Sequence, residues 1–205
     1  YALAWIQALL GETEKSAQSL RAARGWPSDY FFPSRLQEIA TLQWALAQPG
    51  PDRNAAYGLG NFLFDKKRHL EAIAAWEKAR TADEAFATAH RNLGIAYWNA
   101  RRDAAAARAS YEKALACDPA DSRLVSEFVQ LRAKLGDSAT DRLSFLESRL
   151  ALVLDRDDAT VELAALYNET GQPQKALDLL TSRSFHPWEG GEGKVLRQYT
   201  TARLL

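Results

Sequence analysis

The chain has 205 residues, with 26 basic and 26 acidic side chains, and therefore carries no formal net charge. With 47% hydrophobic and 25% charged residues, the composition is that of a globular protein and excludes a largely disordered chain. The balanced charge argues against a nucleic-acid partner, because duplex binding requires clustered cations. No apolar run reaches the roughly 18 residues that a membrane-spanning helix needs, so no membrane partner is expected.

The apolar spacing, with glycine and proline at the stops, predicts helices throughout and no strand. In chain order, these helices are expected over residues 2–10, 13–24, 34–48, 53–65, 69–81, 87–100, 103–116, 121–135, 139–152, 157–170, 173–182 and 192–205. Two stretches interrupt the pattern: residues 25–33 are rich in aromatic side chains and residues 186–194 are rich in glycine. Long loops on a helical scaffold are where binding groups tend to lie.

The sequence repeats itself at a period of about 34 to 35 residues, the spacing of a helix-pair repeat. Leu59-Gly60 recurs 34 residues later as Leu93-Gly94. In the following helix the offset is 35 residues, where Ala72, Trp76 and Ala79 recur as Ala107, Tyr111 and Ala114. We expect Gly60 and Gly94 to lie where the two helices of a pair cross closely. Trp76 and Tyr111 are then expected to fill the gap to the next repeat.

The stretch Arg91–Tyr97, followed by Ala107, Tyr111, Ala114 and Pro119, resembles the tetratricopeptide repeat, whose pattern is W-x2-L-G-x2-Y, then A-x3-F, then a proline. The resemblance implies an all-α α-solenoid of the tetratricopeptide type, a right-handed superhelix of antiparallel helix pairs. A single repeat domain over 1–205 follows as the expectation. It is divided into divergent helices with the aromatic loop (1–50), repeats (53–86, 87–120, a degenerate 121–153, and 157–185), and a loop with a final helix (186–205).

A narrower resemblance is carried by four stretches: Tyr30–Leu36, Asn61–Arg68, Arg91–Tyr97 and Phe185–Lys194. They are similar to the C-terminal half of a family of large bacterial proteins. In that family, tetratricopeptide repeats follow an uncharacterised domain that resembles the galactose-mutarotase β-sandwich. The resemblance implies a bacterial protein of unknown activity, with possible carbohydrate chemistry in a domain outside this sequence.

Both ends of the sequence read as the interior of a helix, and methionine is absent, so we expect a piece of a longer protein. No signal segment is visible at the start, which favours a cytoplasmic location over a secreted one.

A ligand surface is expected on the concave face, formed by the outer side of each first helix. Helical spacing places nine residues there: Tyr57, Asn61, Phe64, Arg91, Trp98, Asn99, Gln130, Asn168 and Glu169. Amide and guanidinium groups suit a peptide backbone or a terminal carboxylate, and Tyr57 and Trp98 would give large rigid contacts. The lysines of a chaperone-type carboxylate clamp are missing, which argues against a chaperone tail. The alternative is a solvated or internally occupied groove.

The glycine-rich loop offers a second candidate site, made of His186, Trp188, Glu189, Glu192 and Lys194. It either presents these groups to a ligand in a neighbouring domain, with Trp188 as a stacking platform for a sugar, or serves as a structured connector. A phosphate-binding loop is excluded because Trp188 and Val195 stand where that motif needs a glycine and a hydroxyl residue.

The sequence lacks the residue patterns that catalytic sites and metal sites need. Cys117 is the single cysteine, which excludes an internal disulfide and a cysteine-based zinc site. His69, His90 and His186 show no zinc-binding spacing. We therefore expect no catalytic residue, no metal and no cofactor in this part of the protein.

The sequence thus predicts a non-catalytic module that binds a protein, a peptide or an adjoining domain of its own chain. The alternative is an accessory domain of a carbohydrate-active protein, in which loop 186–194 docks on or completes a site elsewhere in that protein.

Overall fold

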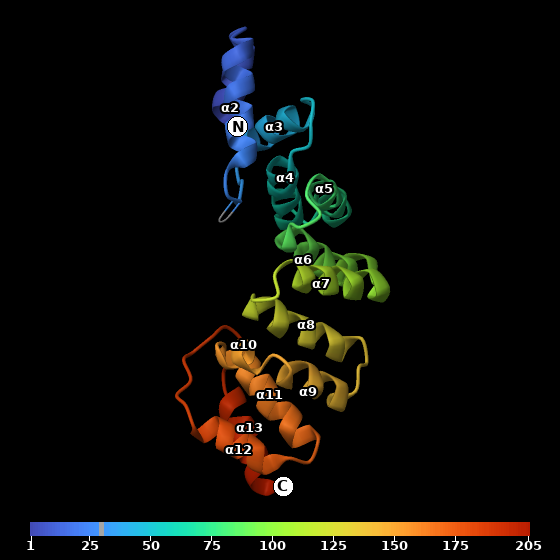
Figure 1. Cartoon of the computed structure of the whole chain (residues 1–205), viewed down its shortest axis with the longest axis vertical. Coiled ribbons are helices and arrows are strands. Elements are labelled where there is room, and N and C mark those ends of the chain that lie inside the picture. The colour runs from blue at the N-terminus through green and yellow to red at the C-terminus, as the bar shows by residue number, and fades with distance from the viewer. Residues whose placement is uncertain (29–30) are drawn as a thin grey trace. The chain divides into compact units, whose positions relative to one another are not determined.

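The computed structural model describes residues 1–28 and 31–205, and within these ranges it is all helical, with no strand. Figure 1 shows the helices in chain order. They are α1 (Ala2–Leu9), α2 (Thr13–Gly25), α3 (Leu36–Leu46), α4 (Arg53–Asp65), α5 (His69–Ala82), α6 (Ala87–Ala96), the π-helix η1 (Tyr97–Arg101), α7 (Ala104–Cys117), α8 (Ser122–Lys134), α9 (Ala139–Glu147), α10 (Leu150–Leu154), α11 (Asp157–Glu169), α12 (Pro173–Thr181) and α13 (Lys194–Leu204). The fold class expected from the sequence, an all-α solenoid of helix pairs, is confirmed.

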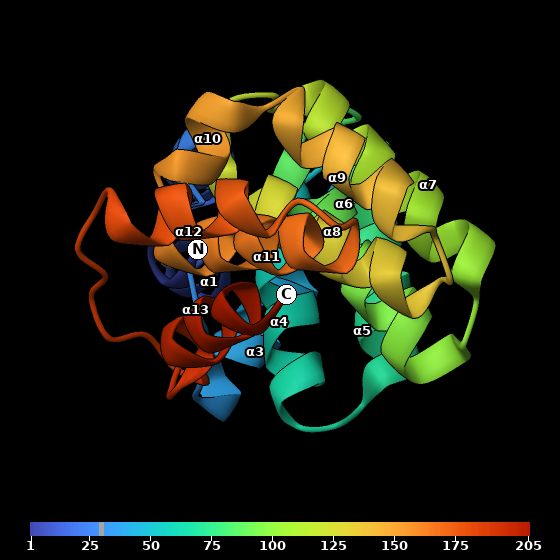
Figure 2. The same ribbon diagram turned by 90° about the horizontal axis from the view of Figure 1, so that it is seen from below.

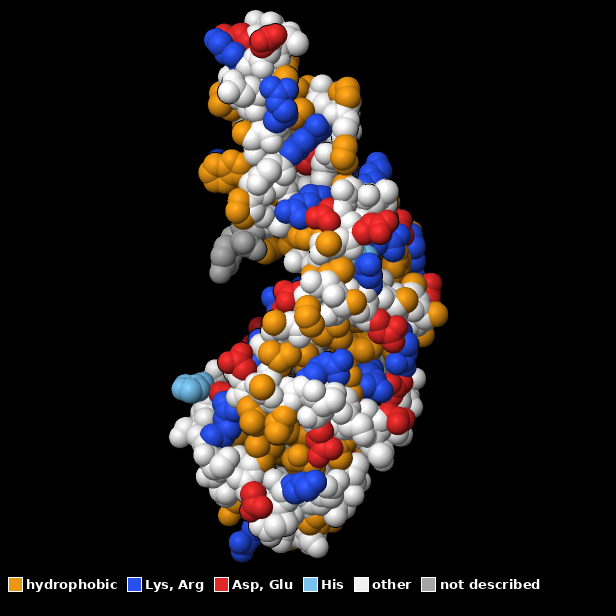
Figure 3. Space-filling view, viewed as in Figure 1, with side chains coloured by type: hydrophobic (Ala, Val, Ile, Leu, Met, Phe, Trp, Pro, Cys, Tyr) orange, Lys and Arg blue, Asp and Glu red, His pale blue; other side chains and the backbone are white. Residues whose placement is uncertain are grey.

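The chain divides into two compact units, Tyr1–Cys117 and Asp118–Leu205, each of which is described by itself. The single repeat domain over 1–205 accordingly stays a prediction. On the face drawn in Figure 3, basic and acidic side chains alternate and neither sign gathers into a large patch. In the described ranges, no helix combines the length and the apolar character needed to cross a membrane.

Helices α4 and α5 pack as a pair in the first unit, and so do α6 and α7. Both crossings are close because a glycine faces an aromatic ring. A Cβ atom on Gly60 would lie 2.4 Å from Trp76, and one on Gly94 would lie 2.6 Å from Tyr111. The prediction for the two glycines is confirmed. The prediction for Trp76 and Tyr111 is corrected, because each ring lies over the glycine of its own helix pair.

The second pair has one residue more than the first pair between the glycine of its first helix and the left-handed residue that follows that helix. A residue with left-handed backbone follows each first helix: Lys67 (φ 62°) after α4 and Arg102 (φ 56°) after η1. Lys67 is seven positions after Gly60, whereas Arg102 is eight positions after Gly94. The expected α-helix 87–100 therefore ends at Ala96 and continues as the π-helix η1, whose wider turn accommodates the added residue.

In the second unit, α11 packs against α9, α10, α12 and α13, and Figure 2 shows α11, α12 and α13 together. Leu124, Leu146, Leu163 and Leu166 are almost fully buried in this unit. The expected helix 139–152 is interrupted, since Ser148 Oγ and the Arg149 guanidinium both donate to the Phe145 carbonyl. The Arg149 amide consequently bonds to Leu146 O, and α10 begins anew at Leu150.

Candidate functional site

The residues predicted for the ligand surface fall in both units. Those of the first unit lie on α4 (Tyr57, Asn61, Phe64), α6 (Arg91) and η1 (Trp98, Asn99). Those of the second unit lie on α8 (Gln130) and α11 (Asn168, Glu169).

Asn61 and Arg91 belong to a connected row of polar side chains, which we call the amide ladder (Asn61, Asn92, Arg91). Asn61 Oδ1 accepts from Asn92 Nδ2 at 3.2 Å and from Trp76 Nε1 at 3.2 Å. The Arg91 guanidinium donates to Asn92 Oδ1 at 3.1 Å. Sequence reasoning missed Asn92, because helical spacing places it away from the expected concave face. In the structure, its side chain reaches Asn61 on α4.

Other predicted residues have packing roles. Tyr57 is 6% exposed, and the edge of its ring meets Phe86 at a centroid distance of 5.1 Å. Phe64 is half-buried against the rings of His69 and Trp76. Trp98 is half-buried and Asn99 is exposed, so these two η1 residues keep solvent-accessible surface.

The aromatic loop lies against α4 on both sides of Asp29 and Tyr30, two residues of the predicted loop 25–33 that fall outside the described ranges. Asn54 Nδ2 donates to Trp26 O at 2.7 Å, and Asn61 Nδ2 donates to Phe31 O at 3.1 Å.

The same helix face makes room for the Phe31 ring. A Cβ atom on Gly58 would lie 2.3 Å from that ring. Positions 54, 58 and 61 share one face of α4 because they are spaced by four and three residues. We call this surface the α4 face (Asn54, Gly58, Asn61).

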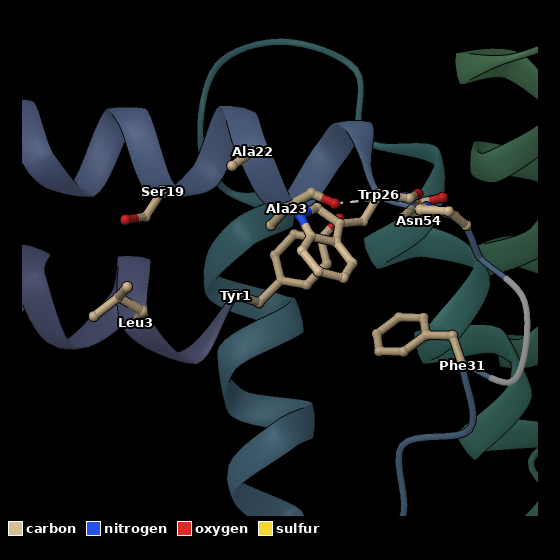
Figure 4. A pocket seen from close by; sticks show the side chains of 9 residues that line it. Tyr1, Leu3, Ser19, Ala22, Ala23, Trp26, Phe31 and Asn54 are labelled. Carbon is tan, nitrogen blue, oxygen red and sulfur yellow. Dashed lines mark hydrogen bonds between the residues drawn. The ribbon is translucent and has the colours of Figure 1, made fainter.

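A hollow of about 380 Å³ adjoins the α4 face. Figure 4 shows Phe31 extending from the loop toward Tyr1, and the two rings stack at a centroid distance of 6.2 Å. Trp26 borders the same hollow and is 68% exposed. Sequence reasoning singled out the aromatic loop but not Asn54 or Gly58, because nothing in the repeat period indicates where the loop lies.

A buried carboxylate holds this region in place. Asp52 is 5% exposed, caps α4 by accepting from the Ala55 amide, and accepts from Tyr1 Oη at 2.6 Å and Arg24 Nε at 3.1 Å. Burial, followed by the hydrogen bond to Asp52, raises the pKa of Tyr1 well above its ordinary value.

Loop 186–194 is fixed to the start of α11 by Asp157. This carboxylate accepts from the Arg183 guanidinium at 2.6 Å, from the His186 amide at 2.8 Å and from His186 Nδ1 at 3.2 Å. Burial by itself would raise the pKa of Asp157, but the bonds from His186 and the Arg183 charge outweigh it and lower that pKa.

Within the loop, Trp188 lies over Gly191, where a Cβ atom would come within 2.4 Å of the indole. His186, Glu189, Glu192 and Lys194 are exposed. A hollow of about 610 Å³ separates the loop from α13, and its lining includes Phe185, Trp188 and Tyr199. The structure thus brings some predicted loop residues to the rim of an aromatic cavity.

The remaining predicted residues divide between internal bonding and exposure. Asn168 is 7% exposed and donates to Gln198 O at 3.0 Å, which joins α11 to α13. Glu169 is exposed and pairs with Arg142 at 3.1 Å. Gln130 is exposed on α8. In the part of the chain that the structure describes, no group of three or more His, Cys, Asp or Glu residues is arranged to hold a metal ion.

A sequence model of the tetratricopeptide repeat matches residues 39–85 and 69–122. Solved structures agree with this match in fold. YrrB, described as a tetratricopeptide repeat protein with an unusual peptide-binding site, is 18% identical with a TM-score of 0.64, over 81% of this chain and 84% of that one. MamA is 16% identical with a TM-score of 0.60, over 82% and 90% of the two chains.

A third similar structure is the APC/C hetero-tetramer Cut9–Hcn1, at 14% identity and a TM-score of 0.59. The match covers 82% of this chain and 33% of that one. Residues 39–122 thus contain tetratricopeptide repeats, which the α4–α5 and α6–α7 pairs provide.

Proposed function

We propose, from the tetratricopeptide repeats that this chain contains, that it is a non-catalytic module that binds a protein or peptide through the first-helix surface of α4, α6 and η1. The amide ladder is the observation that carries the proposal. Asn61 and Asn92 bond to each other and position the Arg91 guanidinium, and a guanidinium is a group that recognises a carboxylate or a main-chain carbonyl. Trp98 and Asn99 lie on η1, which continues α6, and they add a large rigid side chain and a further amide to this surface. The peptide-binding site named for YrrB is consistent with such a role.

An affinity capture tests this proposal. The wild-type chain, an Arg91→Ala/Trp98→Ala variant and a Glu112→Ala/Lys113→Ala control on the exposed surface of α7 are immobilised and compared by mass spectrometry. We expect a partner retained by the wild type and the control and lost by the first variant, followed by a 1:1 titration with the purified partner. Equal capture by all three chains would contradict binding at this surface.

The aromatic cavity beside α13 favours a second candidate, an accessory role to a carbohydrate-active domain elsewhere in a longer bacterial protein. Trp188 and Tyr199 line the cavity with Glu192 at its side, and aromatic faces with nearby carboxylates suit sugar rings and their hydroxyl groups. Under this role, Trp188→Ala or Glu189→Gln lowers the activity of the longer protein, whereas Arg91→Ala/Trp98→Ala leaves it unchanged. The reverse pattern supports the peptide-binding role.

A further inference from the structure

The described residues of the segment 26–33, which we call the internal segment, contact the α4 face in the way that a bound peptide contacts a groove. The hydrogen bonds run from the side-chain amides of Asn54 and Asn61 to the main-chain carbonyls of Trp26 and Phe31. Carbonyl acceptors are available whatever the residue type. Pro27 and Pro33, which lack an N–H group, therefore forfeit neither bond.

Gly58 determines which side chain of the segment fits against α4. The Phe31 ring lies where a Cβ atom at this position would stand, at 2.3, 2.8 and 3.0 Å from three of its carbon atoms. Tyr1 stacks with the ring at a centroid distance of 6.2 Å, and Pro33 is buried. The site is therefore shaped for a planar side chain, carried here by a backbone whose Phe31 amide donates to Ser28 O at 3.2 Å.

Comparison of the two helix pairs shows that this face is particular to α4. The position 34 residues after Gly58 is Asn92, whose side chain bonds back to Asn61 of the preceding pair. On α6, Asn92 contacts the first helix of the preceding pair. On α4, the residues of the corresponding face contact the internal segment instead. Asn54 and Asn61 correspond by the same offset to Thr88 and Ile95, so the arrangement Asn–Gly–Asn does not recur on α6.

We infer that the α4 face is a binding site for a peptide with an aromatic side chain, and that the internal segment is its built-in ligand, which a partner peptide displaces. The inference rests on the proposed function and names the class of peptide recognised. Trp26 and Phe32 are each 68% exposed, so the segment is held by the bonds from Asn54 and Asn61 and by the packing of Phe31 against the hydrophobic core. Tethering also gives it an effective concentration on the order of millimolar, so that a free peptide competes poorly with it.

The test replaces residues 26–33 with a glycine–serine linker of equal length, which leaves Ser34 and Arg35 to begin α3. The probe is a fluorescent synthetic peptide of residues 25–34, followed by anisotropy. We expect 1:1 binding to the linker variant and at least tenfold weaker binding to the wild-type chain, where the site is occupied. Binding should also weaken at least tenfold when Phe31 of the peptide is alanine.

Gly58→Ala, added to the linker variant, is the matched control in the protein. Alanine favours the helix and should leave the circular dichroism unchanged, but its methyl group fills the space for the ring and abolishes binding. A linker variant that keeps its helicity and does not bind the peptide overturns the inference. If the partner capture by the Arg91/Trp98 surface succeeds in that case, the proposed function stands without it.

A second measurement applies if the linker variant does not fold. Gly58→Ala in the otherwise unchanged chain must expel the Phe31 ring, so chymotrypsin cleavage after Phe31 should accelerate at least tenfold. An unchanged cleavage rate overturns the inference.

Discussion

At the scale of single residues, the recurring feature is a glycine beneath an aromatic ring. Gly58 lies under Phe31, Gly60 under Trp76, Gly94 under Tyr111 and Gly191 under Trp188, and in each case a Cβ atom would come within 2.3 to 2.6 Å of the ring. Protein interiors are packed too densely to yield such space at no cost. Packing therefore requires glycine, which has no Cβ atom, at these four positions. The requirement does not depend on unusual backbone angles.

Replacing Gly94 with alanine is expected to destabilise the chain by about 1–3 kcal/mol, because the new methyl group meets the Tyr111 ring at 2.6 Å and the Ala107 carbonyl at 3.3 Å. The matched control is Gly25→Ala at the end of α2, where a Cβ atom meets nothing within 4 Å. The control should be neutral or slightly stabilising. Urea unfolding measures both variants, and an equal effect of the two substitutions would contradict the packing argument.

Tyr97 predicts a loss of stability in alkali. Burial and a 2.7 Å hydrogen bond to Glu77 raise the pKa of Tyr97 to about 12. Because the folded state holds this proton more tightly, the contribution is complete below the ordinary tyrosine pKa of about 10 and is lost as pH rises toward 12. Between pH 9 and pH 11, the wild type should lose on the order of 1 kcal/mol more than Tyr97→Phe. Urea midpoints at the two pH values measure the difference, and parallel losses in both chains count against the prediction.

At the scale of helices and loops, Asp157 fastens the segment that precedes α13. Since the pKa of Asp157 is lowered in the folded state, its tether is intact above the ordinary aspartate pKa of about 3.9 and weakens as pH falls below it. Exchange protection of the His186 amide, corrected for the intrinsic rate, should therefore decline between pH 5 and pH 3. Full protection retained at pH 3 would show that the loop is held by other contacts.

Asp157→Asn should weaken the same tether at neutral pH by removing the charge that faces Arg183. Trypsin cleavage after Arg183 and Lys194 is then expected to accelerate severalfold. Asp155→Asn, at an exposed position two residues away, is the matched control and should cleave at the wild-type rate.

The helices were predictable from sequence because apolar period, glycine and proline act locally, and most boundaries agree within two residues. The offsets of 34 and 35 can be read from the sequence, but nothing in them indicates that η1 takes up an added residue. The break at Arg149 depends on competition for the Phe145 carbonyl, which no periodicity reveals. The α4 face was out of reach for a related reason: the internal segment has no period of its own, and only its tertiary position brings Phe31 to Gly58.

At the scale of the whole molecule, each of the two units contains its own buried leucines: Leu93 in the first, and Leu163 and Leu166 in the second. In helical repeat proteins, stability is approximately a sum of repeat terms and nearest-neighbour contacts. A defect should therefore loosen its own surroundings before it reaches the rest of the chain.

Leu163→Ala is expected to destabilise by about 2–5 kcal/mol and to reduce amide exchange protection first within residues 118–205. Leu93→Ala should do the same within residues 1–117. Hydrogen exchange followed by mass spectrometry locates the loss in each variant. Uniform loss over both units from either substitution would show that the chain opens as one cooperative body.

The π-helical turn at Tyr97–Arg101 also bears on which deletions the chain tolerates. Its wider turn takes up the added residue, and the helix still ends before a left-handed residue, Arg102. That turn is accordingly the place where loss of a single residue does least harm. A chain lacking Ala100 regains the seven-residue spacing of its neighbour and should remain folded, whereas loss of one residue from the middle of α4 would rotate every later side chain of that helix away from its contacts.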